Sequence, residues 1–142
     1  MKKITPFLWF DNNAEQAVDF YCSIFKDSKK GDVSRMGDGS IMVANFTLMG
    51  REYMALNGGP HFTLNEAFSL FVTVDTQEEV DELWRAFTKD GGAEQQCGWV
   101  KDRFGVSWQI VPKALGELMG GPDPVKSSLL FIAISHVIFL PV

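Results

Sequence analysis

The sequence has few of the histidine and cysteine residues from which metal sites and disulfide frameworks are built. Its 142 residues include two histidines, His61 and His136, and two cysteines, Cys22 and Cys97. A metal site built on three imidazoles is therefore excluded before folding is considered. Each cysteine lies in an apolar stretch without a CxxC partner, so we expect two buried free thiols and a reducing compartment.

Basic residues and long apolar segments are also scarce. Thirteen Lys and Arg residues face eighteen Asp and Glu residues, which gives a net charge of -5. Such a surface repels phosphate backbones and anionic lipids, so neither nucleic acid nor a membrane is an expected partner. Residues 129–142 are almost wholly apolar but too short for a transmembrane helix of about 20 residues, and we expect them to cover an apolar surface. Without a signal-peptide pattern at its start, the chain is expected to be cytoplasmic.

The apolar residues that are present suffice for one core and follow a repeated pattern. Hydrophobic residues make up 46% of the chain and charged residues 22%, as in a globular domain. Their periodicity predicts a strand at residues 4–10, a helix at 14–25, and strands at 33–36, 41–48 and 52–56. The order recurs with a strand at 68–74, a helix from Thr76, one or two strands within 94–101 and a last strand at 106–111.

The repetition predicts an α+β fold made of two βαβββ modules. A shift of 64 residues lays Thr5, Phe7 and Asp11 over Ser69, Phe71 and Asp75, as a duplicated module would. We expect modules at about 4–59 and 68–112 in one domain of residues 1–124, with 125–142 as an atypical apolar tail. The modules would form a curved mixed sheet with the helices on its convex face and a ligand-sized hollow on the other.

Local signals add detail to this architecture. Asn12 or Asn13 can cap the first helix, and Thr76 with Glu79 forms a capping box for the second. Asp102 is expected to be exposed at a strand end. Trp108 falls on the core side of its strand by alternation.

Strand alternation also predicts which side chains face the hollow. It selects Thr5, Phe7 and Trp9 in the first strand; Tyr53, Ala55 and Asn57 in the fourth; Ser69, Phe71 and Thr73 in the fifth; and Ser107, Gln109 and Val111 in the last. These side chains are aromatic or neutral, with almost no titratable group. Such a cavity suits apolar or aromatic ligands and gives weak means of proton transfer, so no catalytic residue is assigned.

Several sequence segments together resemble the vicinal oxygen chelate superfamily (glyoxalase/bleomycin resistance/dioxygenase), and within it the PhnB-like branch often labelled demethylubiquinone methyltransferase-like. They are Thr5-Pro6-Phe7-Leu8-Trp9-Phe10 followed by Ala14-Glu15-Gln16-Ala17 and Phe20-Tyr21, the turn Leu56-Asn57-Gly58-Gly59-Pro60, and Asp102-Arg103-Phe104-Gly105-Val106-Ser107-Trp108-Gln109-Ile110. The resemblance spans residues 4 to about 124. It implies a homodimer with clefts near the module and subunit interfaces.

The resemblance also says where a metal would be held. Metal-dependent members place His or Glu on the first, fourth, fifth and eighth strands, positions that here correspond to Thr5, Ala55 or Asn57, Ser69 and Gln109. Hydroxyls and amides hold a transition metal poorly in competition with water, so we expect neither a metal nor another cofactor. Gln109 and Ser69 can instead hydrogen-bond a ligand, or each other.

Three functions from different classes follow from these expectations. The first is a non-enzymatic protein that binds a small, partly aromatic ligand through Thr5, Phe7, Trp9, Asn57, Ser69, Phe71 and Gln109, as in metal-free drug-binding members. The second is a divalent-metal-dependent lyase, isomerase or dioxygenase that recruits its cation through Asn57, Gln109, His61 or the partner subunit. The third is a structural dimer without a ligand. Methyl transfer is disfavoured because no Gly-rich turn joins a predicted strand to a helix.

Overall fold

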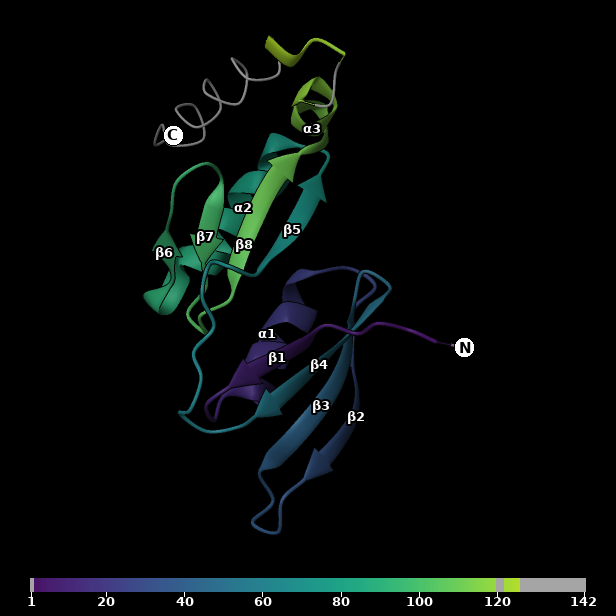
Figure 1. Cartoon of the computed structure of the whole chain (residues 1–142), viewed down its shortest axis with the longest axis vertical. Coiled ribbons are helices and arrows are strands. Elements are labelled where there is room, and N and C mark those ends of the chain that lie inside the picture. Colours follow the sequence, from purple (N-terminus) through teal and green to yellow (C-terminus); the bar gives the residue numbers. More distant parts are fainter. Residues whose placement is uncertain (1, 120–121, 126–142) are drawn as a thin grey trace. The chain divides into compact units, whose positions relative to one another are not determined.

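A computed structural model describes residues 2–119 and 122–125 (Figure 1). The chain divides into two compact units, Met1–Leu64 and Asn65–Val142. Both are mixed α and β structures, which confirms the predicted fold class. The expected apolar tail and His136 lie outside the described residues, and the single domain over residues 1–124 stays a prediction.

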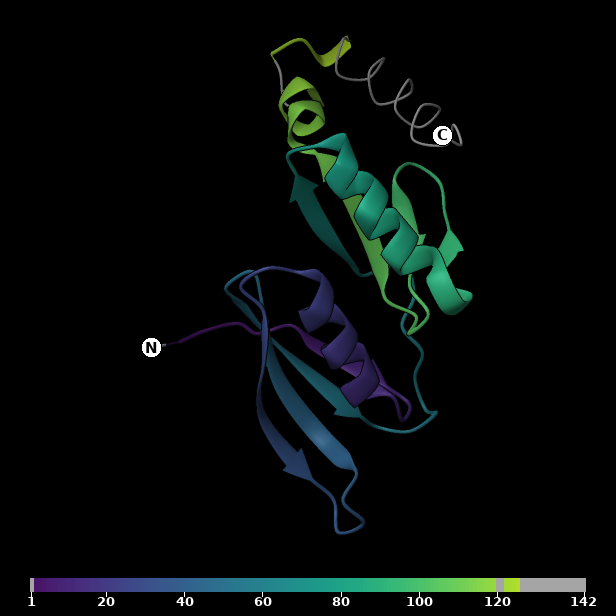
Figure 2. The same ribbon diagram turned by 180° about the vertical axis from the view of Figure 1, so that it is seen from behind.

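The first unit holds one mixed sheet and one helix. Its elements are β1 (Phe7–Phe10), α1 (Ala14–Ile24), β2 (Lys29–Arg35), β3 (Ile41–Leu48) and β4 (Arg51–Asn57). The strand order is β1-β4-β3-β2, with β1 parallel to β4 and the other neighbours antiparallel. Helix α1 packs against β3, β4 and β2, and Figure 2 shows it lying across one face of this sheet.

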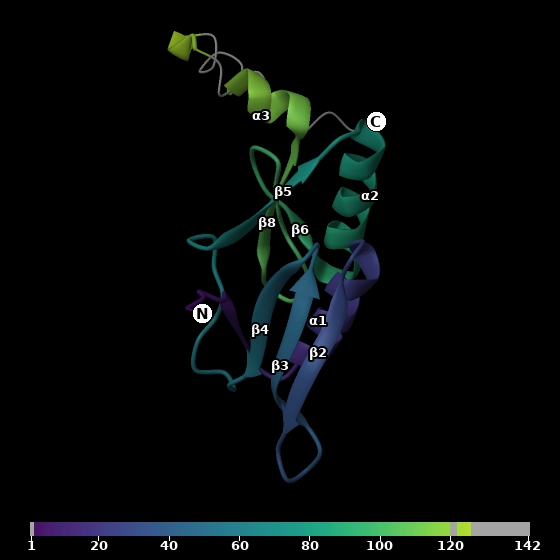
Figure 3. The same cartoon turned by 90° about the vertical axis from the view of Figure 1, so that its right-hand side faces the viewer.

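The second unit repeats the same order. Its elements are β5 (Ser69–Val74), α2 (Gln77–Thr88), a short 3-10 turn (Lys89–Gly91), β6 (Ala93–Glu94), β7 (Trp99–Lys101), β8 (Ser107–Pro112) and α3 (Lys113–Met119). The strand order β5-β8-β7-β6, with β5 parallel to β8, reproduces the first sheet strand for strand. Figure 3 shows α2 on one side of this sheet.

Each helix buries its apolar stripe against its own sheet. In the first unit Leu8 and Phe10 of β1 are 2% and 3% exposed, so the predicted core side of that strand is confirmed. Trp108 is buried in the second unit as predicted, with its ring stacked on Phe87 at 4.6 Å between centroids. The buried positions of α1 and α2 are Ala14, Ala17, Val18 and Tyr21, and Val80, Leu83 and Phe87.

The helix starts differ in how far they follow the prediction. At α2 the capping box is present as expected, since the Glu79 N–H donates to the Thr76 hydroxyl at 3.2 Å and the Thr76 N–H to the Glu79 carboxylate at 3.2 Å. At α1 the N-cap is Asn13, but its side chain makes no capping hydrogen bond. The side chain that accepts a hydrogen bond from the first turn of α1 therefore comes from another residue, described below.

No helix within the described part of the chain combines the length and the apolar character that crossing a membrane requires.

Candidate functional site

Each sheet has its helix on one face, and the opposite face, called here the open face, carries the candidate site. In the first unit the register pairs Phe7 with Met54 and Trp9 with Leu56, so these side chains share the open face. Phe7 is 50% exposed. Thr5 precedes β1 with the same alternation and is partly exposed. The part of this face along β1 and the second half of β4 is thus apolar.

Trp9 lies against the loop that follows β4. Its indole N–H donates to the Gly59 carbonyl at 2.9 Å, and its ring meets Phe62 edge-on at 4.9 Å. A Cβ at Gly58 would lie 2.3 Å from the Trp9 ring, so only glycine allows this approach. The loop therefore fixes the tryptophan ring.

The open face of the second unit combines polar and aromatic side chains. Its register gives one row of Ser69, Ser107 and Lys101 and a second row of Phe71, Gln109 and Trp99. The Gln109 amide donates to the Ser69 hydroxyl at 2.9 Å, which is one of the two alternatives that the sequence left open. Phe71 is 59% exposed beside this pair. The structure thus brings Ser69, Phe71 and Gln109 together on one face.

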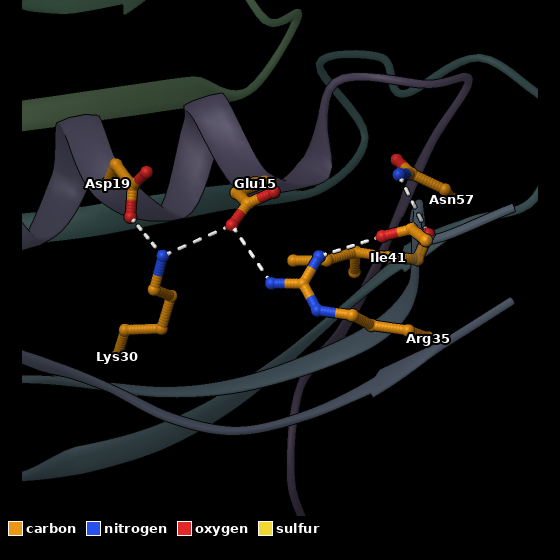
Figure 4. Close-up of polar contacts among 7 residues, drawn as sticks. Glu15, Asp19, Lys30, Arg35, Ile41 and Asn57 are labelled. Carbon is orange, nitrogen blue, oxygen red and sulfur yellow. Dashed lines mark hydrogen bonds and ion pairs between the residues drawn. The ribbon is translucent and has the colours of Figure 1, made fainter.

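Asn57 does not lie on the open face, so its predicted orientation is wrong. It pairs with Phe10, and both point to the helix side of the sheet. Its side-chain oxygen accepts from the Ala14 N–H at 2.8 Å. Its side-chain nitrogen donates to the Ile41 carbonyl at 3.0 Å, as Figure 4 shows. Ala55 and Tyr53 share that side, since they alternate with Met54 and Leu56. The predicted alternation of β4 was shifted by one residue, and such a shift assigns every side chain of a strand to the opposite face.

Asp102 corrects a second expectation, because it is 3% exposed rather than a solvated strand end. One carboxylate oxygen accepts from the N–H groups of Phe104 and Val106 at 2.9 and 3.1 Å, and the other from the Trp108 indole at 2.8 Å. Backbone and indole donors stabilise a buried carboxylate. The segment that begins at Asp102, one of those that resemble the vicinal oxygen chelate superfamily, therefore builds the β7–β8 turn.

Sequence reasoning missed a cluster around Lys101. Glu66, in the segment before β5, forms an ion pair with Lys101 and accepts from the Gln95 side-chain amide at 3.0 Å. These two partners lower the pKa of Glu66 to about 2. The alternation of Trp99 and Lys101 in β7 would have placed Lys101 on this face, but nothing in the sequence marked Glu66 as its partner.

Two polar atoms near this cluster are unsatisfied. Among the described residues, the Ser107 hydroxyl and the side-chain oxygen of Gln95 are buried and have no hydrogen-bond partner. Ser107 is 1% exposed and lies directly opposite Lys101 in the ladder. Buried polar atoms without partners are rare in folded proteins, so both stand out.

The residues at the family's metal positions do not fit a divalent cation. Thr5, Ser69 and Gln109 offer only neutral oxygens and an amide, and Ser69 and Gln109 bond to each other. On β4 the open face presents Met54 and Leu56, which are not ligands for a hard cation, and Glu52, whose carboxylate is paired with Lys3. Within residues 2–119 and 122–125, no three His, Cys, Asp or Glu side chains are grouped so that they could hold a metal ion.

The cysteines are less buried than expected. Both Cys22 and Cys97 are free and partly exposed. Partial burial of the Cys22 thiol raises its pKa, and the nearby negative charge of Asp19 has a smaller effect in the same direction. A raised pKa disfavours the thiolate, so Cys22 is a poor nucleophile.

Comparisons with known proteins give one family and several structures of the same fold. The family model described as 3-demethylubiquinone-9 3-methyltransferase matches residues 2–111. The chain is similar to the PhnB protein from Bacillus cereus, at 34% identity over 78% of this chain and 99% of that one, with a TM-score of 0.72. A comparison with curated proteins gives no match.

More distant structures share the fold alone. Protein PA1353 from Pseudomonas aeruginosa is 22% identical over 79% of this chain and 98% of its own, with a TM-score of 0.65. A glyoxalase/bleomycin resistance protein from Albidiferax ferrireducens T118 is 14% identical over 78% of this chain and 98% of its own, with a TM-score of 0.53.

Proposed function

Because this chain belongs to the PhnB-like family described as 3-demethylubiquinone-9 3-methyltransferase, within the vicinal oxygen chelate superfamily, we propose that it binds a small, partly aromatic ligand without a metal ion. The open face of each unit supplies a binding surface. Thr5, Phe7 and Trp9 contribute from the first unit, and Ser69, Phe71 and Gln109 from the second.

The observation that carries this proposal is the surroundings of Phe71. A phenyl ring that is 59% exposed lies beside the Gln109–Ser69 hydrogen bond. Small-molecule sites typically combine apolar walls with a few oriented polar groups. The neutral donor set at the family's metal positions supports binding without a cation.

Methyl transfer is not part of the proposal, although the family description names it. A nucleoside cofactor is usually cradled by a Gly-rich turn between a strand and a helix. Here β1 connects to α1 through Asp11-Asn12-Asn13 and β5 connects to α2 through Asp75-Thr76, both without glycine, and α3 follows β8 directly.

A thermal-shift screen with aromatic and quinone-like compounds, followed by calorimetry of the hits, tests the proposal. Phe71→Ala should weaken binding about tenfold, since removing an apolar contact of this size costs about 1.4 kcal/mol or more. Met36→Ala removes another exposed apolar side chain, at the β2–β3 hairpin, and should leave affinity unchanged. Uniform silence across the screen would instead favour a structural dimer.

Elemental analysis of dialysed protein tests the metal-free part. We expect no stoichiometric Zn, Ni, Mn or Fe, and retention of one of them would favour the metal-dependent enzyme. We further propose a cytoplasmic homodimer, and the half-exposed Phe7 and Phe71 rings support the dimer, since exposed apolar side chains favour an interface. Sedimentation velocity showing a monomer at micromolar concentration would contradict the dimer.

A further inference from the structure

Glu66 reaches the open face of the second unit from a segment with few other attachments. Residues 65–68 are exposed. Their backbone makes local hydrogen bonds, from the Ala67 N–H to the Asn65 side chain at 2.9 Å and from the Phe68 N–H to the Asn65 carbonyl at 3.4 Å. The Glu66 side chain, by contrast, crosses to Lys101 on β7 and to Gln95 beyond β6. The Glu66 carboxylate can thus leave Lys101 and Gln95 without breaking these backbone hydrogen bonds.

The groups around this carboxylate have more hydrogen-bonding capacity than Glu66 uses. Lys101 and Gln95 both contact the same oxygen of its carboxylate, Oε1. Ser107 lies opposite Lys101, so their Cβ atoms are about 5 Å apart. Among the described residues the Ser107 hydroxyl is buried and without a partner. Leaving such a group unpaired costs about 1–3 kcal/mol, which a bound ligand would recover.

We infer that Lys101, Gln95 and Ser107 bind the carboxylate group of the ligand, and that Glu66 occupies this place until the ligand displaces it. The inference deepens the proposed function and rests on it. A ligand carboxylate would repeat the Glu66 contacts with one oxygen and accept from the Ser107 hydroxyl with the other. Trp99 and Phe71, in the next row of the ladder, flank the place of an attached aromatic ring.

The internal carboxylate lowers the apparent affinity for any external one. A site that is free for only a fraction of the time binds more weakly by that fraction. Because the pKa of Glu66 is about 2, its carboxylate stays ionised and competes throughout the neutral range. Glu66→Gln keeps the size of the side chain but removes its charge, so it should release the site.

Calorimetry with benzoate and its neutral analogue benzamide at pH 7 tests the inference. The wild-type chain should bind benzoate more tightly than benzamide, and Glu66→Gln should tighten benzoate about tenfold while leaving benzamide unchanged. Lys101→Met should abolish the preference and Lys101→Arg should retain it. Glu52→Gln is the matched control, because Glu52 forms a comparable exposed ion pair with Lys3 at 2.5 Å in the first unit, and it should behave as wild type.

A second readout uses acetate, which has no aromatic ring. Acetate should shift the side-chain amide resonances of Gln95 in Glu66→Gln and not in Lys101→Met. Benzamide binding without any preference for benzoate, or silent Gln95 resonances, would overturn the inference and leave the proposed function standing. Failure of every aromatic compound with every variant would remove both. Circular dichroism of each variant confirms that it is folded.

Discussion

Asn57 joins three elements through one side chain. As the last residue of β4, it accepts from the first N–H of α1 and donates to the first carbonyl of β3. The first N–H groups of a helix have no partner within the helix, and Asn13 at the N-cap position offers none from its side chain. The tertiary contact replaces the local cap.

Asn57→Ala should therefore lower the free energy of unfolding by about 1–2 kcal/mol, the range for a lost cap and an unpaired buried donor. Urea denaturation measures the change. Asn45→Ala is the matched control, since Asn45 is exposed and donates to the Asp32 carbonyl at a longer 3.3 Å. Equal losses in the two variants would contradict the capping role.

Gly58 allows the Trp9 ring to approach the backbone. A Cβ there would lie 2.3 Å from the ring, so Gly58→Ala must displace the indole and its hydrogen bond to Gly59. We expect a loss of about 1–3 kcal/mol, as for overpacking in a core, with a shift in tryptophan fluorescence. At Gly37, no described atom lies within 4 Å of an added Cβ, so Gly37→Ala is the control and should leave the spectrum unchanged.

At the scale of elements, the β7–β8 connection is organised by one buried carboxylate. Asp102 receives three donors, two from the turn backbone and one from the core residue Trp108, and Gly105 turns the chain at φ +90°. The core of the second unit and the turn that closes its sheet are thereby linked.

Asp102→Ala should leave all three donors without this partner and lower the free energy of unfolding by about 3 kcal/mol. Asp38→Ala is the comparison, because Asp38 accepts from the Ser40 N–H in the β2–β3 hairpin but is exposed. Its loss should be much smaller, since solvent replaces that contact. Chemical denaturation followed by Trp fluorescence gives both values, and similar losses would argue against burial as the cause.

The strand β2 shows why an element can escape prediction. Its sequence, Lys29–Arg35, is polar and has no alternation, and the sequence predicted only residues 33–36. The strand exists because β3 pairs with it and because Lys30 reaches Glu15 at 3.3 Å and Asp19 at 2.8 Å on α1 (Figure 4). These contacts are tertiary, and strand propensity is overridden by such context.

The strands and helices with clear apolar runs could be predicted from the sequence. The face on which a side chain lies and the partner of a polar side chain were harder to predict. The strand Ile41–Leu48 has the predicted bounds because it is a short, mainly apolar run with a turn at each end. The side of Asn57 was wrong because the fourth strand has apolar residues on both faces, so its sequence did not fix the register. The partner of Lys101 was missed because Glu66 is 35 residues away in a loop.

At the scale of the whole molecule, stability should depend on pH at both ends. On the acid side, hydrogen bonds lower the pKa values of Glu66 and Asp38. On the alkaline side, the hydrogen bond to Asp19 raises the pKa of Lys30, and burial raises those of Cys22 and Tyr53. A raised folded pKa gives stability that is lost as pH rises, and a lowered one gives stability that is lost as pH falls. The stability maximum therefore lies between these ranges.

A variant can show how far Glu66 accounts for the loss of stability at low pH. As pH falls from the ordinary Glu value of 4.5 toward about 2, the unfolded chain takes up a proton that folded Glu66 resists, so stability falls with pH in this window. Glu66→Gln removes the titrating group and should give a flatter slope than the wild-type chain. Urea midpoints at pH 5, 4 and 3 measure both slopes. If Glu66→Gln keeps the wild-type slope, the contacts with Lys101 and Gln95 do not form in solution, because those two contacts are the main reason that the folded carboxylate is harder to protonate than the unfolded one.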